Sequence, residues 1–248
     1  MMTKKILPVI AVFMFSACAE LKQIAERMES GPLTNQEVIE GLKQALTIGA
    51  DSAASRLAAV DGYYRDELVR IMLPPEAEII TENLSLLPGG AKLVEDIILR
   101  INRSAEDAAR EAAPIFNRAV TGMTIQDGFT ILRGENDAAT QYLKAQTHGQ
   151  LYDLYQPRIK SSLDKPLVGN ISTTESWETL TGQWNRLAGS AAGRIADLKP
   201  VETDLAAYLT EQALDGLFLK LAQEELKIRT DPAARVTDLL RRVFGHDR

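Results

Sequence analysis

The longest regular pattern in the sequence lies in residues 91–120, where apolar and small side chains recur every three or four positions. This spacing places them along one face of an α-helix, because the helical period is 3.6 residues. The stripe consists of Val94, Ile97, Ile98, Ile101, Ala105, Ala108, Ala112, Ile115 and Ala119. Pro114 is expected to kink this helix, since proline cannot donate a hydrogen bond to the carbonyl of Arg110. A stripe of this length must be buried against other elements, so it predicts a helical core.

Helical signals also dominate the rest of the chain. Thr34-Asn35-Gln36-Glu37 has the form of a capping box, and apolar residues at helical spacing follow it as far as Asp61-Gly62. Further helices are expected from Pro74-Pro75 to Pro88, from Thr124 to Gly134, from Asn136 or Asp137 onward, around Trp177 to Leu187, from Thr203 to Arg229, and from Val236 to Phe244.

Two segments are predicted to lack helices. Residues 157–176 contain two prolines and many hydroxyl side chains, which favours a surface loop. Residues 189–200 are rich in glycine and alanine and indicate a second break. No sustained period-two alternation bounded by hairpin turns appears anywhere. We therefore predict an all-α fold, namely a single irregular multi-helix bundle over residues 33–248.

The N-terminus has the layout of a secretory signal, with two lysines, an apolar segment at 6–15 and then small residues. The apolar segment is too short to cross a membrane, which takes ~20 residues. Phe15-Ser16-Ala17-Cys18 resembles a bacterial lipobox, in which the cysteine is acylated and becomes the first residue of the mature chain. We expect a signal peptide over residues 1–17, a lipid anchor on Cys18, and a tether or loosely packed first helix over 18–32.

Ala19 follows the cysteine in place of aspartate, which favours the outer membrane, with the body facing the periplasm. Two alternatives to the lipid anchor are an ordinary signal whose cleavage site includes a cysteine, and a buried helix that ends in Cys18.

Composition argues against several classes of function. The formal net charge is −6 at pH 7 and there is no strongly basic block, so nucleic acid is not an expected partner. Cys18, His148 and His246 are the whole supply of cysteine and histidine, which leaves no disulfide and no Cys/His zinc cluster. No glycine-rich phosphate loop or Gly-x-Ser-x-Gly elbow is present either. We expect no metal and no organic cofactor.

Several short stretches carry a family resemblance. They are GLKQAL at 41–46, IMLP at 71–74, Ile101-Asn102-Arg103 with Ala105-Glu106, Met123-Thr124 with Asp127, GENDAATQYL at 134–143 and EELKIR at 224–229. Together, and in this order, they resemble a bacterial family known as domain of unknown function 4197, over roughly residues 33–245. The resemblance implies a helical domain on secreted or lipid-anchored bacterial proteins, and it implies no activity.

A polar cluster within the longest helix is the first candidate site. Helical geometry places Asn102 and Glu106 together on the flank of the apolar stripe, with Arg103 beside them. A carboxylate and an amide above small alanine side chains could bind a polar group of a ligand. The alternative is a set of ordinary helix ion pairs, Glu106 with Arg110 and Arg103 with Asp107.

Asp127 and Asp137 complete the candidate set. Asp137 ends the stretch Gly134-Glu135-Asn136-Asp137, whose oxygens suggest calcium, but the ligand spacing of an EF-hand is missing. Acidic residues at helix N-termini are accounted for by capping, so no metal site is expected.

These observations favour a non-enzymatic, envelope-anchored helical module that binds a protein or another envelope component. The first alternative is a carrier for an apolar ligand in a cavity between the helices, because helical bundles can leave such space. The second is a hydrolase that pairs Glu106 with Asp127 or Asp137, which requires the carboxyl groups to converge in one cleft.

Overall fold

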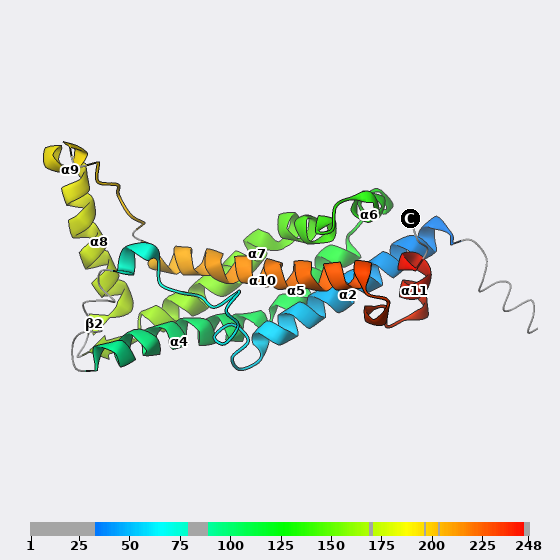
Figure 1. Ribbon diagram of the computed structural model, residues 1–248, viewed down its shortest axis with the longest axis horizontal. Coiled ribbons are helices and arrows are strands. Elements are labelled where there is room, and N and C mark those ends of the chain that lie inside the picture. The colour runs from blue at the N-terminus through cyan, green and yellow to red at the C-terminus, as the bar shows by residue number, and fades with distance from the viewer. Residues whose placement is uncertain (1–32, 79–88, 169–170, 196, 203, 246–248) are drawn as a thin grey trace, which may run out of the picture.

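The computed structural model describes residues 33–78, 89–168, 171–195, 197–202 and 204–245. These residues are almost entirely helical, which confirms the all-α prediction. The long helices run along one axis and form an elongated bundle, with a shorter pair of helices standing across one end (Figure 1). The predicted signal peptide, Cys18 and the segment 18–32 lie outside the described residues.

The described elements follow one another along the chain. They are α2 (Asn35–Ala58), η2 (Pro75–Ala77), α4 (Gly90–Ala109), α5 (Ala112–Thr121), α6 (Ile125–Arg133), α7 (Ala138–Leu163), β1 (Pro166–Val168), β2 (Ile171–Ser172), α8 (Thr173–Gly189), α9 (Ala191–Ile195), α10 (Leu205–Thr230), η3 (Pro232–Ala234) and α11 (Asp238–Phe244). The short strands β1 and β2 pair antiparallel and were not predicted.

The helices α7 and α10 form the centre of the bundle. α7 packs against α10, α4 and α5, while α2 covers α10, α5 and α4. Side chains at intervals of four or eight residues on α7 and α10 are fully or almost fully buried: Leu143, Leu151, Tyr155, Ile159 and Leu163 on α7, and Leu205, Leu209, Ala213, Leu217 and Leu221 on α10. The core therefore runs along the length of the molecule between two antiparallel helices.

Capping residues begin several helices as the sequence predicts. Thr34 and Glu37 form a reciprocal capping box on α2, and Thr124 and Asp127 form a second one on α6. The predicted helix start at Pro74-Pro75 is confirmed by η2, and residues 79–88 of the predicted helix lie outside the described residues. The predicted break at 189–200 is confirmed only in part. The long helix α8 does end there, but the short helix α9 lies within the segment.

The apolar stripe at 91–120 has six buried residues, with Val94, Ile97 and Ala119 half-buried, but it belongs to two helices. α4 ends at Ala109 and α5 begins at Ala112, so the expected single kinked helix is wrong. Pro114 lies in the first turn of α5, where backbone N–H groups have no partner within the helix. Its missing donor therefore costs little, and the chain breaks before the proline instead of bending at it.

The predicted loop at 157–176 is wrong at both ends. α7 continues through Pro157 to Leu163 and α8 begins at Thr173, so among the described residues only 164–168 and 171–172 lie between the two helices, in a turn and the β1–β2 pair. Proline inside a helix costs ~3 kcal/mol. Burial of Tyr155, Ile159 and Leu163 in the core offsets this cost, since each large apolar side chain contributes ~1.5–3 kcal/mol.

Candidate functional site

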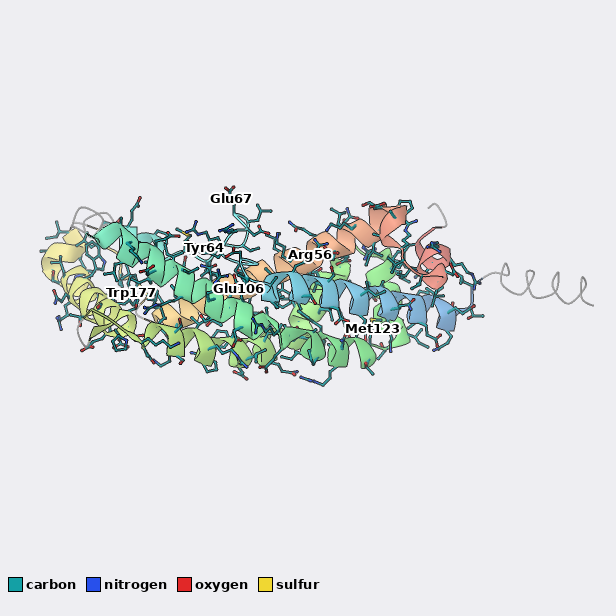
Figure 2. The ribbon with its side chains drawn as sticks, turned by 90° about the horizontal axis from the view of Figure 1, so that it is seen from below. Arg56, Tyr64, Glu67, Glu106, Met123 and Trp177 are labelled. Atoms are coloured by element: carbon teal, nitrogen blue, oxygen red, sulfur yellow. The ribbon has the colours of Figure 1, made fainter. Side chains whose placement is uncertain are left out.

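Glu106 on α4 holds the turn that follows α2. Its side chain is buried, and Oε1 accepts hydrogen bonds from the backbone N–H groups of Tyr63 at 3.2 Å and Tyr64 at 3.3 Å. The turn exposes these two amides to α4 because Asp61 adopts the left-handed conformation, with φ of 68°. Figure 2 shows Glu106 lying inside the molecule next to Tyr64, whereas Glu67 of the same connection points into solvent. The carboxylate acts as a cap for a turn far away in the sequence.

Asn102, one helical turn earlier, holds the extended segment further along this connection. Its Oδ1 accepts from the N–H of Ile71 at 2.9 Å, and its Nδ2 donates to the carbonyls of Ile71 and Ile98, both at 2.8 Å. The side chain is fully buried. Both amide hydrogens and the amide oxygen are thus used within the fold.

Arg103 closes the cluster toward solvent. Its guanidinium donates to Glu106 at 2.6 Å and to Asp61 at 2.5 Å, and these two bonds raise the pKa of Arg103. The guanidinium also lies over the ring of Tyr64, 5.7 Å from its centroid. Tyr64 donates its hydroxyl to Glu95, which raises the pKa of the phenol.

The helix ion pairs expected for this region are wrong in their partners. Glu106 pairs with Arg103, three residues before it, and Arg110 lies near Asp107 at 3.8 Å. The reason is burial: Glu106 is enclosed, whereas Arg110 has an exposed side chain just past the end of α4. A buried carboxylate takes the donors that reach it inside the protein.

Asp127 and Asp137 lie elsewhere, at the connection between α6 and α7. Asp127 accepts from the N–H and the hydroxyl of Thr124 at 3.0 and 2.7 Å, and these bonds lower the pKa of its carboxyl group. Asp137 precedes α7 and accepts from Gln141 at 3.0 Å. In Figure 1 this connection lies toward the end of the bundle that carries α11, away from the middle of the molecule where Glu106 lies. The structure brings Asn102, Arg103 and Glu106 together and places the two aspartates apart from them.

A second buried carboxylate was missed by the sequence reasoning. Glu225 on α10 accepts hydrogen bonds from the backbone N–H groups of Ala139 at 3.0 Å and Thr140 at 2.8 Å, in the first turn of α7. Arg229 completes the arrangement, since it donates to Glu225 at 2.7 Å and to the carbonyl of Ile131 at 3.0 Å. Glu225 follows Leu217 and Leu221 at intervals of four, so a glutamate within the apolar stripe of α10 was the available signal.

A sizeable hollow lies beside this network, and we call it the end hollow. It has a volume of about 480 Å³ and is formed by α2, α6, α10, α11 and the residues after η3. Its walls combine apolar side chains, including Val38, Phe129 and Phe244, with the guanidinium groups of Arg133 and Arg235. A neighbouring apolar cavity between α2, α7 and α10 has a volume of only about 20 Å³, the size of one water molecule.

At the opposite end of the bundle, α8 and α9 stand across the long helices (Figure 1). We call α8, α9 and the return segment 197–202 the arm. Its base is held by Trp177, which is buried and donates to the carbonyl of Glu202 at 3.2 Å. Further out, Trp184 donates to the carbonyl of Lys199 at 2.8 Å. Three large apolar side chains of the arm are exposed: Trp184 at 37%, Leu187 at 50% and Ile195 at 88%.

Two kinds of site are not found among the described residues. They contain no group of three or more His, Cys, Asp or Glu side chains placed to hold a metal ion. None of the described helices is long and apolar enough to cross a membrane.

The fold and these sites define an all-α protein whose buried carboxylates join distant segments. The chain belongs to the family described as protein of unknown function (DUF4197), whose sequence profile matches residues 32–245. No curated protein and no solved structure matches the chain at a significant level. Motifs that carry the resemblance meet in space, because Glu225 of EELKIR accepts hydrogen bonds from the start of α7 within GENDAATQYL.

Proposed function

We propose that this protein is a non-enzymatic binding module of the bacterial envelope, anchored through a lipid on Cys18 and facing the periplasm from the outer membrane. The observation that carries the proposal is the arm, which stands across one end of the bundle (Figure 1) and has three exposed large apolar side chains. Trp184 and Leu187 are three residues apart on α8 and therefore share one face of the helix. Adjacent exposed apolar residues of this kind mark surfaces that contact a partner.

The polar residues of α4 support a binding module over an enzyme. The polar atoms of Asn102 and Glu106 bond to the backbone of the connection after α2, and Arg103 bonds to two carboxylates. Asp127 accepts a hydrogen bond from Thr124 at the start of α6, and Asp137 accepts one from Gln141 at the start of α7. General acid and base catalysis needs carboxyl groups that converge on a cleft, and these five residues are committed to holding the fold.

The test of the arm is site-specific photo-crosslinking in living cells. A photoreactive residue at Leu187 is expected to give a discrete crosslinked band, and the same residue at Lys160, exposed on α7, serves as the matched control. Mass spectrometry of the band identifies the partner. Equal band patterns at the two positions, or no adduct at Leu187, would contradict the proposal.

Anchoring has a separate test. Wild-type protein is expected to fractionate with the outer membrane and to take up a palmitate analogue, and Cys18→Ala is expected to do neither. Equal labelling of the two proteins would exclude the lipid on Cys18 and leave the crosslinking result unaffected.

A further inference from the structure

The end hollow has the size and position of a ligand site. Its volume of about 480 Å³ lies within the range of small-molecule pockets, which is ~300–1,000 Å³. It is bordered by segments far apart in the sequence, from Val38 on α2 to Phe244 on α11. It lies at the end where α2 begins, opposite the arm (Figure 1).

The charge of the end hollow is positive. No aspartate or glutamate belongs to its described walls, whereas three arginines do. Arg229 is neutralised by Glu225, at 2.7 Å. Arg235 donates to the carbonyls of Ile228 and Arg229 at 3.1 and 2.9 Å, so it keeps its full charge while it holds the last turn of α10.

Arg133 is the arginine that is free to bind. Its guanidinium lies over the ring of Phe129, 5.4 Å from the centroid, and no described carboxylate pairs with it. The side chain is exposed at the rim of the end hollow, on the last residue of α6. A guanidinium placed in this way can bind a carboxylate or phosphate oxygen with two parallel hydrogen bonds.

Half of the ten residues that line the end hollow are apolar, and the others are the three arginines, Asn136 and Thr230. Phe129, Leu132, Val243 and Phe244 line the end hollow together with Val38. A small polar anion would leave these apolar surfaces exposed to water, and a neutral apolar molecule would make no charge-assisted hydrogen bond with the guanidinium of Arg133. A ligand that satisfies both parts carries one anionic group on an apolar chain.

We propose that the end hollow binds a single-chain amphiphile through its anionic headgroup at Arg133 and its apolar chain along Phe129 and Phe244. The headgroup is a carboxylate or a phosphate monoester, which share the oxygen geometry that a guanidinium binds. This site is separate from the arm and does not depend on a protein partner there.

Isothermal titration calorimetry tests this assignment on the full chain from residue 18 with Cys18→Ala, so that no attached acyl group competes. The probes are dodecanoate and dodecyl phosphate below their micelle concentrations, with dodecanol and inorganic phosphate as comparisons. We expect saturable 1:1 binding of one or both anionic amphiphiles. Dodecanol and inorganic phosphate are each expected to bind at least about tenfold more weakly, because each lacks one of the two contacts.

Arg133→Gln is the decisive variant, because this exposed side chain makes no hydrogen bond that holds the fold. It is expected to weaken binding of the anionic amphiphile about tenfold or more and to leave binding of dodecanol unchanged. The matched control is Arg186→Gln, an exposed arginine on α8 in the arm, which is expected to bind like the parent. Equal affinity of dodecanol and the anionic probes, equal behaviour of the two variants, or no saturable binding would overturn the proposal.

Discussion

Glu225 accepts both the backbone N–H and the hydroxyl of Thr140 through one carboxylate oxygen, with each bond 2.8 Å long. A residue near the end of α10 therefore caps the start of α7, which lies 85 positions earlier in the chain. The two central helices of the bundle are fixed in register by this contact. Glu106 ties the turn after α2 to α4 in a similar way, so two buried carboxylates join segments that lie far apart in the sequence.

Replacing Glu225 with alanine should strongly destabilise the protein. The change leaves the amides of Ala139 and Thr140 without acceptors and the guanidinium of Arg229 without its counter-charge. Loss of one partner of a buried ion pair costs ~3–5 kcal/mol. Urea denaturation followed by circular dichroism measures the change. Glu178→Ala, on an exposed position of α8, is the control and should stay within ~0.5 kcal/mol of the parent.

Asn102→Asp should loosen the connection after α2. The variant loses the two donated bonds to the carbonyls of Ile71 and Ile98 and places a negative charge beside them, in a fully buried position. We expect a loss of ~2–4 kcal/mol in the free energy of unfolding. Hydrogen exchange gives the local readout, since protection of the Ile71 amide should fall more than protection in α10. Unchanged protection at Ile71 would show that the connection is held by other contacts.

Pro157→Ala should stabilise the protein. Alanine restores the backbone donor to the carbonyl of Asp153 within α7 and removes the clash of the proline ring. The gain is reduced because proline restricts the unfolded chain, an effect of ~0.4–1 kcal/mol. We expect the free energy of unfolding, measured by thermal denaturation, to increase by ~1–2 kcal/mol. The matched control is Pro114→Ala in the first turn of α5, where no helical hydrogen bond is regained and no increase should be seen.

The Asp127 carboxyl group should titrate below its ordinary pKa in the folded protein. The hydrogen bonds from Thr124 favour the charged form, so the capping box contributes its full stabilisation above the unfolded pKa of ~3.9. This contribution is lost as the pH falls through the lower pKa of the folded state. NMR titration should show the pKa of Asp127 rising toward its ordinary value in Thr124→Ala. An unchanged pKa in that variant would remove Thr124 as the cause.

Local patterns predicted what depends on nearby residues. The period of the stripe at 91–120, the capping box at Thr34 and the grouping of Asn102 with Glu106 all follow from helical geometry, and each is present in the structure. The partners of Asn102 and Glu106 could not be predicted in this way, because they lie 31 to 43 positions away. Pro157 misled the prediction for the same reason, since the core that overrides its local preference is built from other helices.

The end hollow shows even more clearly that local sequence patterns do not predict contacts between distant residues. Val38 and Phe244 stand near opposite ends of the described chain and border the same space. Neither residue belongs to a recognisable motif, and only the packing of α11 on α2 brings them together. Arg133 could not be singled out from the sequence either. Its role in the proposal depends on having no ion pair with a described carboxylate, and this depends on the three-dimensional structure.

The length of α7 sets the distance between the end hollow and the arm. This helix begins beside the end hollow and finishes at the strands that lead into the arm, and its 26 residues span about 39 Å at 1.5 Å per residue. A ligand in the end hollow and a partner on the arm would never touch one another. The bundle would then hold the two sites at a fixed separation, because Glu225 ties the start of α7 to α10.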